Sequence, residues 1–207
     1  ATASSAVALA TLGALSSGYA LWEARQYTLR RVDVVRPGRG TAPGRTLRIL
    51  HLSDLHLAPR DTDRIDWVRG LAAEDADLTV ITGDLLGDLD APALALRALE
   101  PHLVRPGLYV RGSNDYFAAK PINPVKYFAG PSRTPTRRPQ IDLTPLADGF
   151  SAAGWVDLDN ARAALTVAGW SIDSRGVDDP HIRLDRYPDV AGPFDATADL
   201  RLGVVHA

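Results

Sequence analysis

The sequence predicts an α/β fold organised around a parallel β-sheet. Short apolar runs at residues 47–52, 78–81 and 108–110 have the length of buried strands. The segments between these runs are each long enough for a helix, and strands that alternate with helices predict a parallel sheet. A polar motif follows each run directly. Because ligand sites of parallel sheets lie beyond the carboxyl ends of the strands, we expect the motifs to meet at one edge of the sheet.

The other elements follow from local patterns. Helical spacing of apolar residues predicts helices over residues 63–74, 91–99 and 141–153. Strands are expected at residues 155–158, 164–167, 170–172 and 200–205, with a turn at Asp159-Asn160 separating the first two. Their close succession indicates hairpins and a second sheet. Residues 118–140 are rich in proline and basic side chains, which predicts an irregular surface insertion.

Bulk composition bounds the class of protein. The 207 residues carry a net charge of −2, so we predict no nucleic-acid binding. The chain contains no cysteine, which excludes disulfides, thiolate zinc sites and a cysteine nucleophile. It also contains no methionine. We therefore interpret the sequence as a fragment of a longer protein.

The N-terminal region, residues 1–34, differs from the rest. The stretch from Ala6 to Leu21 is almost free of charge, and Arg25, Arg30 and Arg31 follow it. This pattern favours a membrane anchor or signal helix with a basic flank, over an alanine-rich helix packed on the domain. The basic flank favours the cytoplasmic side of a membrane, although an extracellular domain stays open. Residues 35–46 predict a linker, and residues 47–207 the main domain.

The motifs after the three strands carry the chemistry. They are Ser53-Asp54-Leu55-His56, Thr82-Gly83-Asp84 and Gly112-Ser113-Asn114-Asp115. Asp54 and His56 stand two residues apart, so in a continuing strand they would share a face. Carboxylate, imidazole and amide donors together are the mixture that holds divalent metals. The motifs therefore predict a metal site at the edge of the sheet.

These motifs resemble those of the calcineurin-like metallophosphoesterases, from about Leu47 to His206. The closest resemblance is to a membrane-anchored, actinobacterial-type branch. It implies a four-layer αββα sandwich whose last strands are missing here. It also implies two divalent ions (Mn, Fe, Zn or Mg) held by Asp54, His56 and the bridging Asp84, with His206 on the second ion. A final Gly-His-x-His block, which the family carries, is absent up to Ala207.

The third motif departs from the family pattern Gly-Asn-His-Asp/Glu. Either Ser113 or Asn114 takes the place of the metal-ligating asparagine, and we favour Asn114 because an amide oxygen is the better ligand. Asn114 or Asp115 then stands where the family has its catalytic histidine. Asp115 would need a raised pKa to assist the leaving group, and Tyr116 and His181 are other candidate donors. His181 belongs to the polar turn 178–181, which is rich in ligand-type side chains; a role in contact with substrate or in support of the metal ligands, and simple solvation, are equally open.

The resemblance implies an enzyme that hydrolyses a phosphate mono- or diester with a hydroxide activated by a dinuclear metal centre. The apolar N-terminal stretch weakly favours a phospholipid or nucleotide-type diester as substrate. The alternative is a truncated, non-catalytic binding or scaffold domain tethered to a membrane, because the last family block is absent.

Overall fold

The computed structural model describes residues 2–34, 45–119 and 138–206. Most of the predicted linker at residues 35–46 and of the predicted insertion at residues 118–140 therefore lies outside the described residues. The chain divides into two compact units, Ala1–Pro37 and Gly38–Ala207. We describe each unit by itself.

The first unit is built on one long helix, α1, Thr2–Glu23. Among its large apolar side chains, Leu12, Leu15, Leu21 and Trp22 are all exposed. Glu23, at its last position, is the helix's only charged residue. Within the described part of the chain, no helix combines the length and the apolarity needed to cross a membrane.

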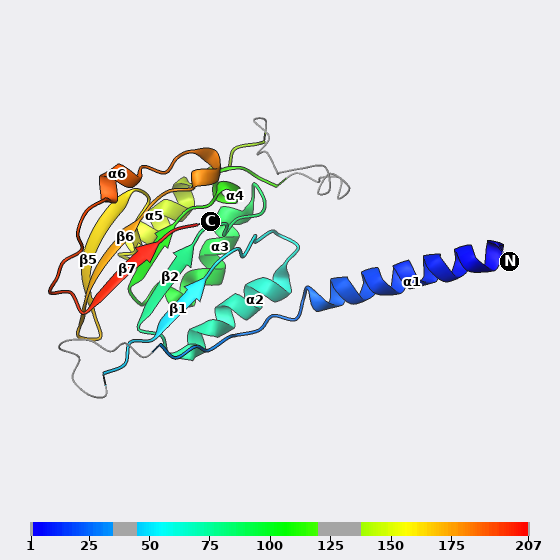
Figure 1. Ribbon diagram of the computed structural model, residues 1–207, viewed down its shortest axis with the longest axis horizontal. Coiled ribbons are helices and arrows are strands. Elements are labelled where there is room, and N and C mark those ends of the chain that lie inside the picture. Colours follow the sequence, from blue (N-terminus) through cyan, green and yellow to red (C-terminus); the bar gives the residue numbers. More distant parts are fainter. Residues whose placement is uncertain (1, 35–44, 120–137, 207) are drawn as a thin grey trace. The chain divides into compact units, whose positions relative to one another are not determined.

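The second unit contains the predicted parallel sheet (Figure 1). Strands β1 (Ile49–Leu52), β2 (Leu78–Thr82), β3 (Gly107–Val110) and β4 (Val156–Asp157) lie in this order, each parallel to the next. The expected hairpin across Asp159-Asn160 is wrong. Because β4 pairs with β3, the turn instead carries the chain from this sheet to the second one.

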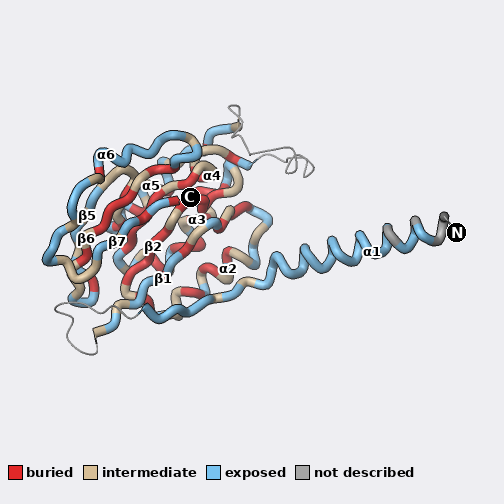
Figure 2. Tube along the Cα trace, viewed as in Figure 1, coloured by how far each residue is buried: buried red, intermediate tan, exposed pale blue. Residues whose placement is uncertain are grey.

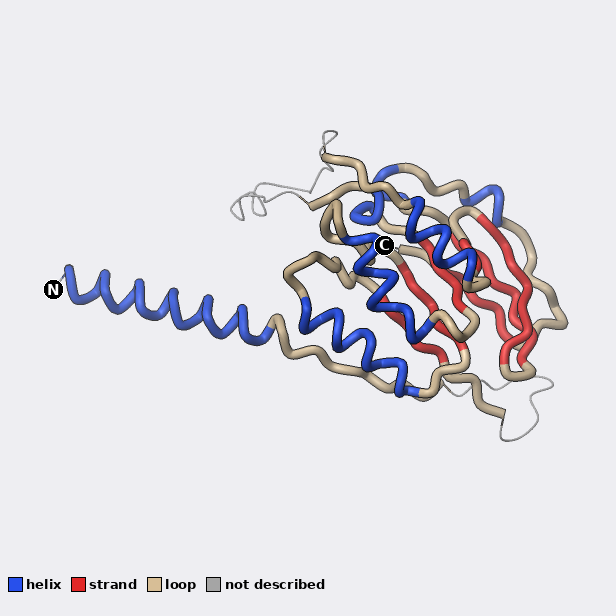
Figure 3. Tube along the Cα trace, turned by 180° about the vertical axis from the view of Figure 1, so that it is seen from behind, coloured by secondary structure: helices blue, strands red, loops and turns tan. Residues whose placement is uncertain are grey.

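Helices cover the outer face of the parallel sheet (Figure 3). They are α2 (Thr62–Gly70), which continues into the short 3-10 helix η1 (Leu71–Glu74), α3 (Ala91–Leu99), which continues into η2 (Glu100–His102), and α5 (Thr144–Ala152). In α3, Pro92 occupies the first turn, where its missing N–H has no helical partner to lose. Buried Ala95, Ala98 and Leu99 form the stripe that faces the sheet. A four-residue helix, α4 (Ser113–Tyr116), follows β3 directly.

The second sheet has the order β5-β6-β7, formed by Ala161–Val167, Trp170–Gly176 and Leu200–Val204. Strands β5 and β6 form an antiparallel hairpin, and β7 lies parallel to β6. The apolar run before His206 is typical of a buried parallel strand. Strand β7 is parallel, but within the described residues it has β6 as its one neighbour, and its residues alternate between half-buried and exposed before the buried Val204. The short helices η4 (Pro180–Ile182) and α6 (Tyr187–Val190) lie between β6 and β7 in the sequence.

The two sheets pack face to face and share the hydrophobic core. Leu78, Val80 and Leu108 of the first sheet meet Ile172 and Val204 of the second. Figure 2 shows this buried band running along the strands. Among the described residues, three of the four predicted layers are therefore present: one helical layer and both sheets. The carboxyl ends of β1, β2, β3 and β7 lie at the same end of this sandwich (Figure 1), which brings the loops after them together.

Candidate metal centre

Backbone hydrogen bonds join the loop after β1 to the loop after β2. The N–H of Asp54 donates to the carbonyl of Gly83 (3.1 Å), and the N–H of His56 donates to that of Asp84 (3.0 Å). One residue later, Leu57 donates to Leu85 (2.9 Å). The two loops are thus fastened residue against residue, which sets the Asp54 and His56 side chains beside Asp84.

The expectation that Asp54 and His56 share a face of a continuing strand is wrong. Both have left-handed backbone, with φ of 54° and 42°, and so has Asp84 with 51°. Left-handed conformations cost non-glycine residues roughly 1–3 kcal/mol each and persist where the surrounding structure enforces them. Here the hydrogen bonds between the loops enforce them. Backbone strain therefore coincides with the three residues expected to bind metal.

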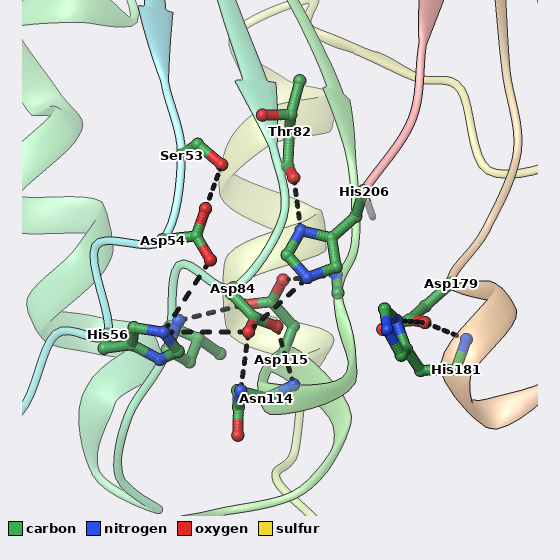
Figure 4. A network of polar contacts seen from close by, with 12 residues as sticks. Ser53, Asp54, His56, Thr82, Asp84, Asn114, Asp115, Asp179, His181 and His206 are labelled. Atoms are coloured by element: carbon green, nitrogen blue, oxygen red, sulfur yellow. Dashed lines mark hydrogen bonds and ion pairs between the residues drawn. The ribbon is translucent and has the colours of Figure 1, made fainter. Parts of the chain in front are cut away.

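The Asp84 carboxylate lies between two histidines (Figure 4). Its Oδ2 is 3.7 Å from Nε2 of His56 and 3.6 Å from Nε2 of His206. Asp54 Oδ1 lies 3.9 Å from the same nitrogen of His56. These distances are too long for hydrogen bonds. However, two ligand atoms that each lie ~2.1 Å from one cation are at most about 4.2 Å apart, so the spacing fits ligands that share an ion.

His206 is oriented by the main chain. Its Nδ1 lies 2.8 Å from the carbonyl oxygen of Thr82, which only accepts hydrogen bonds, so Nδ1 carries the proton. Nε2 of the neutral ring then presents its lone pair to Asp84. Metal-ligating histidines are typically held in this way by a partner on the other ring nitrogen.

Two glycines make the close approach of these loops possible. A Cβ on Gly83, whose φ is 88°, would lie 2.7 Å from the backbone nitrogen of Gly112 and 2.9 Å from the His206 ring. A Cβ on Gly112 would lie 2.3 Å from Oδ1 of Asp84. Any larger residue at either position would push the carboxylate or the imidazole aside.

Asn114 lies directly against Asp84. Its backbone N–H donates to Asp84 Oδ1 (2.9 Å), and its side-chain Nδ2 donates to Oδ2 (2.6 Å). Its amide oxygen instead accepts a hydrogen bond from Arg138. The side-chain amide must therefore rotate by half a turn, which exchanges the places of its oxygen and nitrogen, before the oxygen can bind an ion next to Asp84. Its choice over Ser113 as the ligand stays a prediction.

Asp115 joins the loop after β2 to the loop after β3. It is 3% exposed, and its two oxygens accept the N–H groups of Leu86 and Gly112, both at 2.9 Å. Burial raises the pKa of this carboxyl to about 6, although the two N–H groups lower it. These contacts support a positioning role, and the predicted assistance to the leaving group stays a prediction.

The turn at residues 178–181 reaches the same site. The His181 ring is 6.3 Å from the His206 ring between centroids, and its side chain is 58% exposed. Tyr116, the other candidate donor, gives its hydroxyl hydrogen to Asp178 Oδ2 (2.8 Å), and burial raises its pKa. The sequence pattern pointed to Asp179 only as part of the polar turn 178–181, and it did not point to Arg138. Asp179 groups with Asp84 and His206, and Arg138 contacts Asn114.

Comparison with known proteins identifies the domain. A family model described as calcineurin-like phosphoesterase matches residues 47–190. The chain belongs to this family. His206 lies beyond the matched residues, and no curated protein matches the chain.

The calcineurin-like phosphoesterases bind divalent metals, and this member has residues that fit them. Two groups of side chains bring their ligand atoms within 4.8 Å of one another: Asp54, His56 and Asp84, and Asp84, Asp179 and His206. Asp84 belongs to both groups. Oxygen and imidazole donors in this combination suit Mn, Fe, Zn and Mg, and do not choose among them.

Proposed function

We propose that this calcineurin-like phosphoesterase hydrolyses a phosphate ester at a centre of two divalent ions. The observation that carries the proposal is the place of Asp84 Oδ2, midway between Nε2 of His56 and Nε2 of His206 at 3.7 and 3.6 Å. A carboxylate in this position can bridge two cations. Asp54 and His56 would hold the ion on one side, and His206 the ion on the other.

When bound, divalent ions here supply Lewis acidity toward the phosphoryl oxygens and lower the pKa of water. The residues of the chain do the positioning. Thr82 fixes the tautomer of His206, and Asp115 fixes the loop that carries Asn114. The side chains of Asp54 and His56 are 57% and 41% exposed, compared with 8% for Asp84 and His206. We therefore propose that substrate enters from the Asp54 side.

Arg138 is placed to take over part of the work of the family's missing histidine. Its guanidinium donates to the Asn114 amide oxygen and lies close enough to Asp84 to feel that carboxylate's charge. A guanidinium beside the centre favours binding of a phosphoryl group, because its fork of N–H donors matches phosphate oxygens. It would stabilise charge on the phosphoryl oxygens without donating a proton.

We propose a diester of the phospholipid or nucleotide type as the substrate, and association with a membrane through α1. Support for the membrane proposal is the uncharged run up to Trp22, its exposed Leu12 and Leu15, and the arginines that follow. The test is flotation of the full chain with anionic vesicles, compared with a Leu12→Glu/Leu15→Glu variant. Equal flotation of both proteins would refute this role for the helix.

The test of the catalytic proposal is Asp84→Asn in the Mn²⁺-loaded protein, with bis(p-nitrophenyl) phosphate as substrate. Loss of the bridging charge should weaken the binding of both ions and lower hydrolysis by at least about 100-fold, the equivalent of about 2.7 kcal/mol. Asp88→Asn is the matched control, since Asp88 also follows a glycine in this loop and accepts a hydrogen bond from its own neighbour Asp90. Circular dichroism checks the fold.

Two outcomes contradict the proposal. Hydrolysis by Asp84→Asn at the rate of the unmodified chain would remove Asp84 as the bridge. Binding of two ions by the unmodified chain without hydrolysis of any phosphate mono- or diester would favour the alternative of a binding or scaffold domain.

A further inference from the structure

Asp179 is a buried carboxylate with one oxygen unaccounted for. The residue is 0% exposed. Its Oδ1 caps η4 by accepting the N–H of His181 (2.5 Å) and lies 3.2 Å from Nδ1 of the same residue. Its Oδ2 is also buried and has no hydrogen-bond partner among the described residues. A carboxylate oxygen in such a place is unfavourable unless a cation or a donor reaches it. The cap explains one oxygen and leaves the other to be explained.

Asp179 lies against the metal centre. Asp179, Asp84 and His206 each offer a ligand atom, all within 4.8 Å of one another, and all three residues are buried. Figure 4 shows Asp179 beside His206, on the opposite side of Asp84 from His56. Asp84 lies in the loop after β2, Asp179 directly precedes η4, and His206 follows the end of β7 by two residues.

The orientation of the His206 ring supports a cation at this place. Because Nδ1 donates to the carbonyl oxygen of Thr82, Nε2 is the nitrogen that offers a lone pair toward the two carboxylates. Three electron-rich atoms facing one another repel unless a positive charge lies among them. A divalent cation supplies that charge, because its ligand atoms stand at separations like the 3.6 Å between Nε2 of His206 and Oδ2 of Asp84.

We propose that Asp179 Oδ2 is a ligand of the ion between Asp84 and His206, a step that rests on the proposed function. This half of the centre would then offer two carboxylates and one imidazole in a buried setting. The other half offers the same donor types, but from exposed Asp54 and half-buried His56 beside the shared Asp84. Burial strengthens electrostatic attraction, so the ion next to Asp179 is the more tightly bound one. Two carboxylates and an imidazole suit Mn²⁺.

The experiment is calorimetric titration of the metal-stripped full chain with Mn²⁺, on the unmodified protein and on Asp179→Asn. We expect two ions per unmodified chain, and a loss of at least roughly tenfold in affinity for the tighter ion in the variant. The matched control is Asp178→Asn. Asp178 is also buried, but its oxygens accept hydrogen bonds from Tyr116 (2.8 Å) and from the N–H of Asp179 (2.7 Å), and it is outside the metal group. It should bind Mn²⁺ as the unmodified protein does.

Unfolding in denaturant separates a ligand from a merely structural residue. Without metal, Asp179→Asn should be at least as stable as the unmodified protein, because a buried charge with one unpartnered oxygen is gone. With saturating Mn²⁺ the order should reverse. A second variant, Asp179→Ser, keeps an oxygen that can cap His181 without a carboxylate, and should behave in the same way if the asparagine variant does not fold.

Each result decides a different question. If the unmodified protein binds two ions and hydrolyses the diester, but both Asp179 variants bind Mn²⁺ equally well, the role of Asp179 is refuted and the proposed function stands. Lower stability of the metal-free variants, with unchanged affinity for Mn²⁺, would assign Asp179 to the cap alone. If the unmodified protein binds no Mn²⁺, both proposals fail together.

Discussion

Gly112→Ala should damage the metal centre although it replaces no proposed ligand. The new Cβ would stand 2.3 Å from Oδ1 of Asp84 and 2.8 Å from its backbone nitrogen. Ordinary contact begins near 3.4 Å, so the carboxylate must retreat by about 1.1 Å. A displacement of ~1 Å at reacting groups can lower a rate by about 100-fold. Forcing a methyl group into a packed site also costs roughly 1–3 kcal/mol of stability.

We therefore expect Gly112→Ala to bind Mn²⁺ more weakly, to hydrolyse bis(p-nitrophenyl) phosphate about 100-fold more slowly, and to lose roughly 1–3 kcal/mol in urea unfolding. Gly203→Ala in β7 is the control, since a Cβ there meets nothing within 4 Å. Its stability should stay within about 0.5 kcal/mol of the unmodified protein. If Gly112→Ala retains full metal affinity and full activity, the contact with Asp84 does not position the bridge and the reasoning fails.

Two further predictions concern the third motif and pH. Asn114→Ala should lower the metal content of the purified protein, whereas Ser113→Ala should leave it unchanged; a loss confined to the serine variant would reverse the assignment. Burial raises the pKa of Asp159 to about 7, despite hydrogen bonds from Arg111. The folded state then holds this proton more tightly than the unfolded chain, so Asp159 contributes stability below about pH 4 that is lost as pH rises to about 7. Asp159→Asn lacks that loss, and its stability relative to the unmodified protein, followed by urea unfolding, should rise over the same range; a constant difference would contradict the shifted pKa.

The sequence was most informative about elements whose local pattern fits only one type of secondary structure. Strands β1 to β3 are short and followed by motifs, β2 and β3 are buried, and α3 coincides with its predicted bounds. Pairing partners were less predictable, since residues 155–158 suit a hairpin as well as a parallel edge. Only the packing of the two sheets assigns β4 to the first one.

The site divides in the same way. Motif spacing predicted that Asp54, His56 and Asp84 would come together, as they do, but it suggested a continuing strand where the chain adopts left-handed backbone. That geometry depends on hydrogen bonds to residues 83–85, which no local pattern encodes. Asp179 was missed for a related reason: in sequence it is one acid in a polar turn, and its unpartnered oxygen exists only in three dimensions.

The position of His206 gives the centre a mechanical role. Thr82, whose carbonyl binds its ring, lies 124 residues earlier in the chain. An ion shared by Asp84 and His206 therefore closes one of the longest loops of the domain, and the entropy of such a closure grows with loop length. Strand β7 has one neighbour among the described residues, and the ion shared by Asp84 and His206 would hold its C-terminal end in place. Chelation should thus release β7 first, and its amides should exchange with deuterium sooner than those of β2 while the rest of the sandwich stays folded.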